Sequence, residues 1–236
     1  MTTTSPTTLQ VTTDDGEMPA YLWRPESGSG PGLLLLQEIF GVSAYIRRRA
    51  ADLAAAGYVV LVPELYWRLD QQEVTASGPA GVEQAMALVN RLDWPTTVAD
   101  ADAAFERLAA LDEVRGTPGT MGFCFGGGLA FAVAADVAPT VLVSYYGSAL
   151  PGLLDLAPQV TCPSLHHFGT ADDYLPADAV RTIIEAVTAD GRPARVELHE
   201  GANHAFDNDD FFLHHPEAAA RAWQQTTAFL AEHLPA

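Results

Sequence analysis

Short apolar runs alternate with amphipathic segments along most of the chain. Continuous apolar runs predict strands buried on both faces, whereas apolar positions three or four residues apart predict helices. The strands predicted in this way are Leu33–Gln37, Tyr58–Val62, Gly119–Phe123, Val141–Tyr146, Ser164–Gly169 and Arg195–His199. The predicted helices are Ser43–Ala56, Val82–Leu92, Thr96–Leu111, Gly127–Ala135, Ala177–Ala189 and Pro216–Leu234. Because parallel strands need connections of helix length, this alternation indicates an α/β fold with a mostly parallel central sheet and helices on both faces.

The beginning of the chain departs from this alternation. The segments Leu9–Thr13 and Met18–Arg24 flank Asp14-Asp15-Gly16, which is typical of the tight turn of an antiparallel hairpin. The polar stretch Trp67–Ala80 interrupts the pattern again and is interpreted as an excursion. Since no internal repeat or linker separates two cores, residues 1–236 are predicted to form a single domain.

Charge and composition exclude several classes of function. The chain has 12 basic and 30 acidic residues, a net charge of -18, which disfavours nucleic acid and anionic membrane surfaces as partners. Every basic residue is Arg, and the absence of Lys excludes a lysine Schiff base and a Walker-type phosphate loop. No apolar run approaches a membrane span, and Met1–Thr8 lacks the features of a signal peptide. We therefore expect a cytoplasmic protein with no membrane partner, either a monomer or a weak homo-oligomer.

Metal sites and disulfides are not favoured either. Cys124 and Cys162 form no C-x-x-C pair, and a reducing compartment disfavours a disulfide between them. Adjacent histidines on a strand point to opposite faces, and the acidic cluster lacks the Gly and Glu of a calcium loop. We therefore expect no functional metal. The side chains that could suggest such a metal site are His166–His167, His214–His215, Asp207, Asp209 and Asp210.

The segment Gly122-Phe123-Cys124-Phe125-Gly126 carries the clearest chemical signal. It lies where a predicted strand meets a predicted helix and matches the nucleophile-elbow pattern G-x-Nuc-x-G. The nucleophile of such a turn has a strained backbone, and bulky groups two positions away on either side would collide with it. A helix N-terminus also favours the thiolate. The alternative interpretation is a small buried cysteine that only packs in a glycine-rich turn.

A nucleophile needs a base and an acid that orients the base. Among the seven histidines, His204 lies in a loop between the last predicted strand and the last helix, where such folds place the base. Asp172 and Asp173 follow a buried strand and are both candidates for the acid, although a helix N-terminus rich in acids would also explain them. The order of nucleophile, acid and histidine is that of α/β-hydrolases. The remaining histidines are interpreted as packing residues (His166, His167 and His199) or surface residues (His214, His215 and His233).

These segments together resemble the dienelactone hydrolases, which are cysteine members of the α/β-hydrolase fold. The resemblance rests on Gln37-Glu38-Ile39-Phe40-Gly41, the elbow around Cys124, the Asp172 and His204 loops, and the segments Gly57-Tyr58-Val59 and Tyr145-Tyr146-Gly147. It implies a Cys124–His204–Asp172 triad, with Asp172 preferred because the family pattern places the acid four residues before the proline. It also implies that Glu38 contacts the resting thiol and helps to create the thiolate, while the N–H groups of Ile39 and Phe125 stabilise the oxyanion. The residues expected at the substrate pocket are Phe40, Tyr145, Tyr146, Phe206, Asn208 and Arg68.

The resemblance further implies the hydrolysis of an ester or lactone, of the type that converts carboxymethylenebutenolide to maleylacetate, through a thioester and without a cofactor. The family grips the substrate carboxylate with arginines, but Asn208 occupies one such place here and no Arg lies between Arg68 and Arg91. Arg68 is the remaining candidate for this grip, and a neutral ester or a different lactone is the alternative substrate. A carboxylesterase or thioesterase of the same fold, and a non-catalytic binding protein that keeps the pocket, also remain open.

Overall fold

An eight-stranded sheet forms the centre of the computed structural model, which describes residues 5–75 and 78–236. The expectations for Met1–Thr8 and Trp67–Ala80 fall partly on residues 1–4 and 76–77, which lie outside the described residues. In the order in which they pair across the sheet, the strands are β1 (Thr7–Thr13), β2 (Gly16–Trp23), β4 (Val59–Pro63), β3 (Gly32–Leu36), β5 (Gly119–Phe123), β6 (Leu142–Tyr145), β7 (Ser164–Gly169) and β8 (Ala194–His199).

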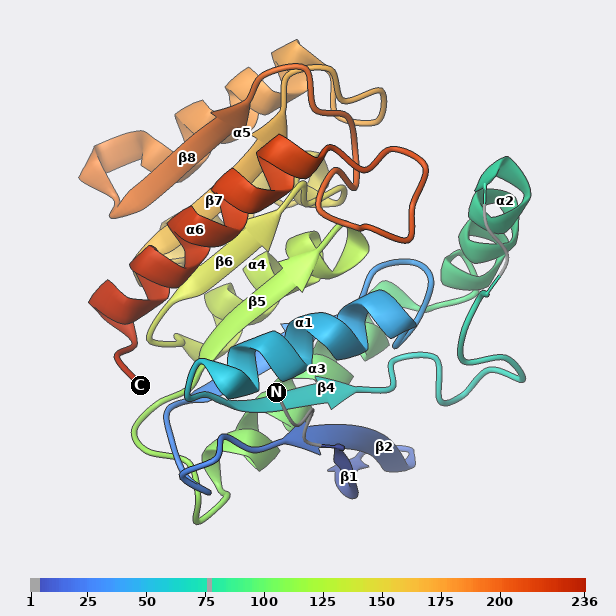
Figure 1. Cartoon of the computed structure of the whole chain (residues 1–236), viewed down its shortest axis with the longest axis vertical. Helices are drawn as coiled ribbons and strands as arrows, with labels where there is room; N and C mark the ends of the chain where they lie inside the picture. The colour runs from blue at the N-terminus through green and yellow to red at the C-terminus, as the bar shows by residue number, and fades with distance from the viewer. Residues whose placement is uncertain (1–4, 76–77) are drawn as a thin grey trace.

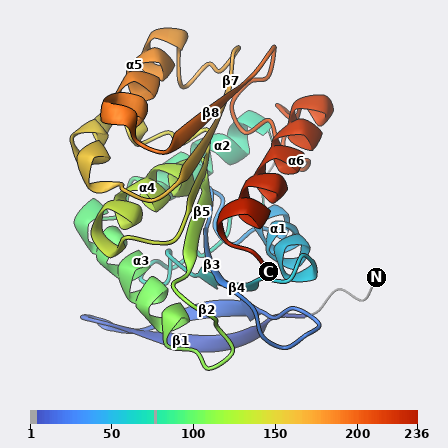
Figure 2. The same cartoon turned by 90° about the vertical axis from the view of Figure 1, so that its left-hand side faces the viewer.

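The six strands from β4 to β8 run parallel, and β1 and β2 form the predicted antiparallel hairpin at one edge of the sheet. Helices α1 and α6 cover one face of the sheet, and α3, α4 and α5 cover the other (Figure 2). Helix α2 stands outside these two layers (Figure 1). The predicted α/β fold with a mostly parallel sheet is therefore confirmed. The helices are α1 (Ala44–Ala55), α2 (Gly78–Val89), α3 (Trp94–Ala109), α4 (Phe125–Val137), α5 (Ala177–Thr188) and α6 (Pro216–His233).

The core lies where the helices meet the central strands. Strands β3, β4 and β5 are buried at every position, which accounts for their continuous apolar sequence. Helix α4 is buried from Phe125 to Ala134, although its first turn is rich in glycine. It begins two residues earlier than the predicted start at Gly127, because packing between strands and helix outweighs the weak helix propensity of glycine.

A smaller apolar cluster lies beneath α2. Tyr66, Val74, Ala85 and Leu88 pack there, and Phe40 from the loop after β3 packs against them. The described part of the stretch Trp67–Ala80 contributes to this cluster before α2 begins. The predicted excursion therefore brings a helix over the carboxyl end of β3, next to the loop that begins at Gln37.

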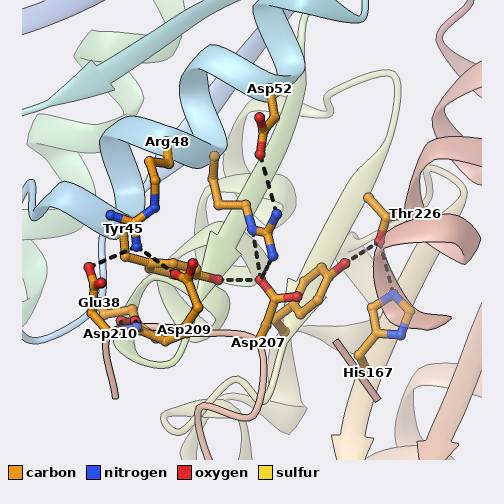
Figure 3. Close-up of polar contacts among 12 residues, drawn as sticks. Glu38, Tyr45, Arg48, Asp52, His167, Asp207, Asp209, Asp210 and Thr226 are labelled. Atoms are coloured by element: carbon orange, nitrogen blue, oxygen red, sulfur yellow. Dashed lines mark hydrogen bonds and ion pairs between the residues drawn. The ribbon is translucent and has the colours of Figure 1, made fainter. Parts of the chain in front are cut away.

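The histidines of β7 and β8 are structural. His166 and His167 point to opposite faces: the His166 ring lies against Phe131 of α4, and His167 Nε2 lies 3.0 Å from the hydroxyl of Thr226 on α6 (Figure 3). His167 Nδ1 also lies 3.0 Å from His199 Nε2. Among the residues that the structure describes, no three His, Cys, Asp or Glu side chains gather as metal ligands. No described helix is long and apolar enough to cross a bilayer.

Burial lowers the pKa of His166 to about 4, and this makes the stability of the fold dependent on pH. The folded protein holds this ring neutral, whereas the unfolded chain takes up a proton below about pH 6.5, so the stabilisation is complete above that pH and is lost as the pH falls toward 4. In His166→Phe this contribution is absent. Urea unfolding gives the free energy of unfolding of both proteins at pH 7.5 and at pH 5. The value for the variant minus that for the wild type should be about 2 kcal/mol more positive at pH 5 than at pH 7.5. An equal difference at both pH values would contradict a neutral buried His166.

Candidate active site

The turn between β5 and α4 holds Cys124 in an unusual backbone conformation. Cys124 has φ 54° and ψ −116° and immediately precedes the first residue of α4. A Cβ on Gly122 would lie 2.0 Å from the carbonyl oxygen of Gly126, and a Cβ on Gly126 would lie 2.4 Å from the carbonyl oxygens of Leu36 and Gln37. Both flanking glycines are therefore required by close backbone approach, as predicted from the elbow pattern.

Three polar side chains meet at the end of this turn. Cys124 Sγ lies 3.1 Å from His204 Nε2, and His204 Nδ1 lies 2.9 Å from Asp172 Oδ2. All three residues are buried, with Cys124 7% exposed. The structure therefore brings together side chains from the loops after β5, β7 and β8, which is the arrangement of a nucleophile, its base and an orienting acid.

The loop after β7 separates the two candidate acids. Asp172 Oδ1 accepts hydrogen bonds from the backbone N–H groups of Tyr174 and Leu175, which leaves Oδ2 facing His204. Asp173 instead accepts a 2.7 Å hydrogen bond from the side chain of Asn203. Of the two carboxylates, the structure places Asp172 against His204.

A buried ion pair anchors the loop that carries His204. Asp207 is fully buried and accepts hydrogen bonds from the Tyr45 hydroxyl at 2.5 Å and from Arg49 Nε at 2.8 Å (Figure 3). Tyr45 and Arg49 lie one helical turn apart on α1, so the helix holds the loop through both side chains. In the sequence Asp207 is only one member of an acidic cluster; its pairing with Tyr45 and Arg49 joins segments about 160 residues apart and is visible only in the fold.

The loop after β3 places a second carboxylate next to the sulfur. Glu38 is 1% exposed and accepts hydrogen bonds from Asn208 Nδ2 at 2.7 Å and from the Tyr146 hydroxyl at 3.4 Å. Burial raises the pKa of Glu38 to about 7, while the hydrogen bond from Asn208 and the charge of His204 oppose this rise. Among the described residues, Cys124 Sγ has His204 and Ser148 as its polar side-chain partners. Glu38 lines the same cavity as the sulfur but forms no hydrogen bond with it.

The charge state of His204 is controlled by its neighbours. Burial lowers the pKa of His204, but the charge on the Cys124 sulfur and the hydrogen bond to Asp172 outweigh burial and raise it to about 10. A protonated imidazole donates from both nitrogens, which matches the contacts of Nε2 with sulfur and of Nδ1 with carboxylate. The geometry therefore fits a thiolate–imidazolium pair.

Two backbone N–H groups beside the sulfur remain available. Among the described residues, neither Ile39 N–H nor Phe125 N–H has a protein hydrogen-bond acceptor. Phe125 begins α4, so its N–H is one of the free donors at a helix N-terminus. The Tyr66 hydroxyl donates to the Ile39 carbonyl oxygen at 2.8 Å and so fixes the next peptide unit, between Ile39 and Phe40.

A small cavity opens over the sulfur. It has a volume of about 120 Å³, and a neighbouring cavity of about 310 Å³ shares Phe40 and Phe211 with it. The residues that line the smaller cavity are Glu38, Ile39, Phe40, Val82, Met86, Cys124, Ser148, Tyr174, His204, Ala205 and Phe211. Phe40 therefore lies at the cavity as predicted, whereas Val82, Met86, Ser148, Tyr174 and Phe211 were missed because α2 and the loops converge only in three dimensions.

Several residues expected at the pocket lie elsewhere. Tyr145, Tyr146 and Phe206 are fully buried behind the cavity wall, where their rings pack together. Asn208 lines the neighbouring cavity. The expectation that Arg68 grips the substrate is wrong, because Arg68 forms ion pairs with Asp15 and Asp100 in a separate cavity beside the β1–β2 hairpin.

Comparison with known proteins places the chain among ester-cleaving relatives. The model of the dienelactone hydrolase family matches residues 18–234. The chain is 37% identical to carboxymethylenebutenolidase 1 of Cupriavidus pinatubonensis over 78% of each chain. It is 34% identical to the carboxymethylenebutenolidase of Pseudomonas putida over 90% of each. The crystal structure of a Klebsiella pneumoniae protein assigned as a dienelactone hydrolase superposes with a TM-score of 0.83 at 28% identity, covering 96% of this chain and 98% of that one.

The contacts of Gly126 predict a strong effect of a single methyl group. Gly126→Ala should lower the free energy of unfolding by about 3 kcal/mol or prevent folding, because the new Cβ would overlap two backbone carbonyl oxygens. Gly152→Ala is the matched control, since nothing lies within 4 Å of a Cβ there. Thermal and urea unfolding of both variants checks this, and equal stability of the two would show that the elbow tolerates a side chain.

Proposed function

This chain belongs to the dienelactone hydrolase family and is a carboxylic ester hydrolase, and we propose that it cleaves an ester or lactone through Cys124 as the nucleophile. The observation that carries the proposal is the continuous contact from Cys124 Sγ through His204 to Asp172, at a strand-to-helix turn that exposes the sulfur to a cavity. This arrangement supports acyl transfer to sulfur, because the base and its orienting acid are both in place.

In the first step the Cys124 thiolate attacks the carbonyl carbon of the substrate. The carbonyl oxygen becomes an oxyanion, which the N–H groups of Ile39 and Phe125 stabilise by an amount typically worth several kcal/mol in barrier height. The carbon–oxygen bond to the alcohol then breaks, and protonated His204 gives its proton to the leaving oxygen. The product of this step is a thioester on Cys124, and in a lactone the alcohol remains attached to the acyl group.

In the second step His204 acts as the base. Once the sulfur is acylated it carries no charge, so the electrostatic contribution that raises the pKa of His204 is removed. The neutral ring then takes a proton from water, and the resulting hydroxide attacks the thioester. Cleavage of the carbon–sulfur bond releases the carboxylic acid and restores the thiolate, so the cycle balances with water as the only co-reactant.

Glu38 is assigned the role of a proton acceptor from the resting thiol. Its buried carboxyl ionises near pH 7, where small changes in its surroundings shift its charge. When the sulfur of the free enzyme is a thiol, an ionised Glu38 takes its proton as the substrate displaces the arrangement around it, and later releases that proton to water. The sulfur thereby enters the thiolate–imidazolium form that attacks, which a protonated Glu38 does not allow. Asn208 and Tyr146 act on the reaction through their hydrogen bonds to this carboxyl.

Two substrate classes fit this mechanism. The curated relatives named carboxymethylenebutenolidase favour a dienelactone, which carries a carboxylate. The residues that line the cavity favour an uncharged ester or lactone, because they include no Arg. Their ionisable side chains are those of Cys124, Tyr174, Glu38 and His204. Without an arginine at the cavity, a substrate carboxylate would be left without an ionic partner.

The first prediction from this mechanism concerns the nucleophile. Cys124→Ala should lower kcat/KM for p-nitrophenyl acetate by at least about 10³-fold, because the attacking sulfur is lost. Asp172→Asn should lower it by about 10²- to 10⁴-fold through loss of the charge that orients His204. Asp173→Asn is the matched control and should stay within about threefold of the wild type, since Asp173 contacts Asn203 rather than His204.

Steady-state rates with p-nitrophenyl acetate and with dienelactone test both substrate classes in the same proteins. Turnover of dienelactone at a rate equal to or above that of the uncharged ester would identify the carboxylated lactone as the preferred substrate. Retention of activity in Cys124→Ala with either compound would rule out the sulfur as nucleophile.

The second prediction concerns the ionisation of Glu38. The kcat/KM of the wild type should rise with pH through an inflection near 7, because Glu38 accepts a proton only in its ionised form. Glu38→Gln should lose this inflection. Asn208→Ala should move it upward by about one pH unit, because removing a donor to the charged carboxyl raises the pKa of Glu38.

The pH profiles of the three proteins are compared with the same uncharged ester. Thr227→Ala serves as a control, because its hydroxyl bonds only to α6 carbonyl groups and should leave the profile unchanged. An inflection near pH 7 that persists in Glu38→Gln would assign it to another group.

A further inference from the structure

Large apolar side chains are exposed in very few places on this molecule, and most of these places adjoin the cavity. Among the described residues the exposed large hydrophobics are Met86, Tyr174, Leu198 and Phe212. Met86 and Tyr174 line the cavity over Cys124 directly. The ring of Phe212 lies 4.5 Å from the ring of Phe211, which also lines it. We call Met86, Tyr174 and Phe212 the apolar rim.

The apolar rim comes from three separate parts of the chain. Met86 lies on α2, Tyr174 follows β7, and Phe212 follows the loop that carries His204. Met86 is 41% exposed, Tyr174 54% and Phe212 57%. Single exposed apolar side chains are ordinary, but two such side chains at one opening, with a third packed against the lining residue Phe211, are typical of a binding surface.

The size of the cavity explains why a substrate would reach the apolar rim. A volume of about 120 Å³ is well below the roughly 300–1,000 Å³ of a usual small-molecule pocket. A substrate whose carbonyl carbon lies at Cys124 can therefore place only a short group inside, and any longer substituent must leave the cavity.

The charges around the cavity decide which exit an apolar substituent takes. Beyond Phe40 and Phe211, the lining of the neighbouring cavity includes two carboxylates, Glu73 and Asp210, and the amide of Asn208, together with Ser43, Ala44, Tyr45, Val74 and Thr75. An apolar group in that direction would displace water from carboxylates, whereas the apolar rim offers methionine and aromatic surface. These acids and the net charge of -18 also disfavour a substituent that ends in a carboxylate.

We infer that the apolar rim binds an extended apolar substituent of an uncharged ester while Cys124 engages the ester carbonyl. This inference rests on the proposed function, and it names the substrate class as uncharged esters with an alkyl or aryl group longer than the cavity. Met86 and Phe212 are then specificity-determining residues that act on binding through the far end of the substrate.

Two ester series test the inference. One series lengthens the acyl group from p-nitrophenyl acetate to the butyrate and hexanoate, and the other lengthens the alcohol from ethyl to hexyl acetate. Full burial of one methylene corresponds to about fourfold in a binding constant, and a half-exposed contact to about twofold. In the wild type, kcat/KM should therefore rise about tenfold from the shortest to the longest member of at least one series, mainly through KM.

Met86→Gln and Phe212→Gln remove apolar surface without emptying the rim. For each variant we take the ratio of kcat/KM for the longest ester to kcat/KM for the shortest ester. This ratio should be about three- to fivefold smaller than in the wild type, and the difference should arise from KM rather than kcat. Leu198→Gln is the matched control, because Leu198 is 47% exposed and lies at a separate cavity between β8 and α5. Its ratio should equal that of the wild type.

A third arm separates apolar contact from chain length alone. The p-nitrophenyl monoester of adipic acid has the chain length of the hexanoate and ends in a carboxylate. Its kcat/KM should be at least about tenfold below that of the hexanoate at low salt, and added salt should narrow the gap. An adipate monoester that is hydrolysed as fast as the hexanoate would overturn the uncharged substrate class.

Binding without turnover keeps this test independent of the proposed mechanism. Titration calorimetry with the Cys124→Ala protein should show tighter binding of methyl hexanoate or hexyl acetate than of methyl acetate, and Met86→Gln in the same background should reduce the difference. If the wild type hydrolyses no ester, the proposed function fails while this result still supports the apolar rim.

Three further outcomes would overturn the inference. In the first, neither series shows a rise in the wild type and neither long ester binds Cys124→Ala more tightly. In the second, the rim variants give the same ratio as Leu198→Gln. In the third, sedimentation shows that Met86→Gln and Phe212→Gln dissociate an oligomer, because the apolar rim would then be covered by a second copy of this chain.

Discussion

The backbone reversal at Cys124 is the constraint on which the rest of the site depends. The reversal puts the chain of α4 against the carbonyl oxygens of Leu36 and Gln37, at a distance that only glycine at position 126 allows. In the same turn Cys124 immediately precedes Phe125, whose N–H has no protein acceptor among the residues that the structure describes. A single local conformation thereby sets both the position of the sulfur and that of the N–H at the start of α4, the two groups that the proposed mechanism uses.

The loops around the sulfur are held by buried hydrogen bonds and a buried ion pair, which water screens less than contacts at the surface. Asp207 has no exposure and is compensated by Tyr45 and Arg49, so α1 fixes the position of the loop that carries His204 and Asn208. Asp172 is fixed by two backbone N–H groups of its own loop. Buried charges that are paired on several sides give the geometric precision that acyl transfer requires.

Burial has opposite consequences for the two ionisable groups nearest to the sulfur. Glu38 lies away from water with only neutral donors, and its pKa rises to about 7. His204 is equally buried but lies between the sulfur and Asp172, and its pKa rises to about 10. Glu38 thereby changes its charge near neutral pH, whereas the proposed mechanism requires the pKa of His204 to fall once the sulfur is acylated.

The sequence by itself determined the alternation of strands and helices, the hairpin at the edge and the residues of the elbow. These follow from local periodicity and from the backbone freedom of glycine, which a linear pattern records directly. It left Asp172 and Asp173 as equivalent carboxylates on spacing alone, and the family resemblance that preferred Asp172 could not show which of them faces His204. It also wrongly placed Arg68 near the substrate. Only the tertiary structure decided these points and brought Met86 and Phe211 to the cavity, because contacts between segments far apart in the chain depend on how helices and loops pack over the sheet.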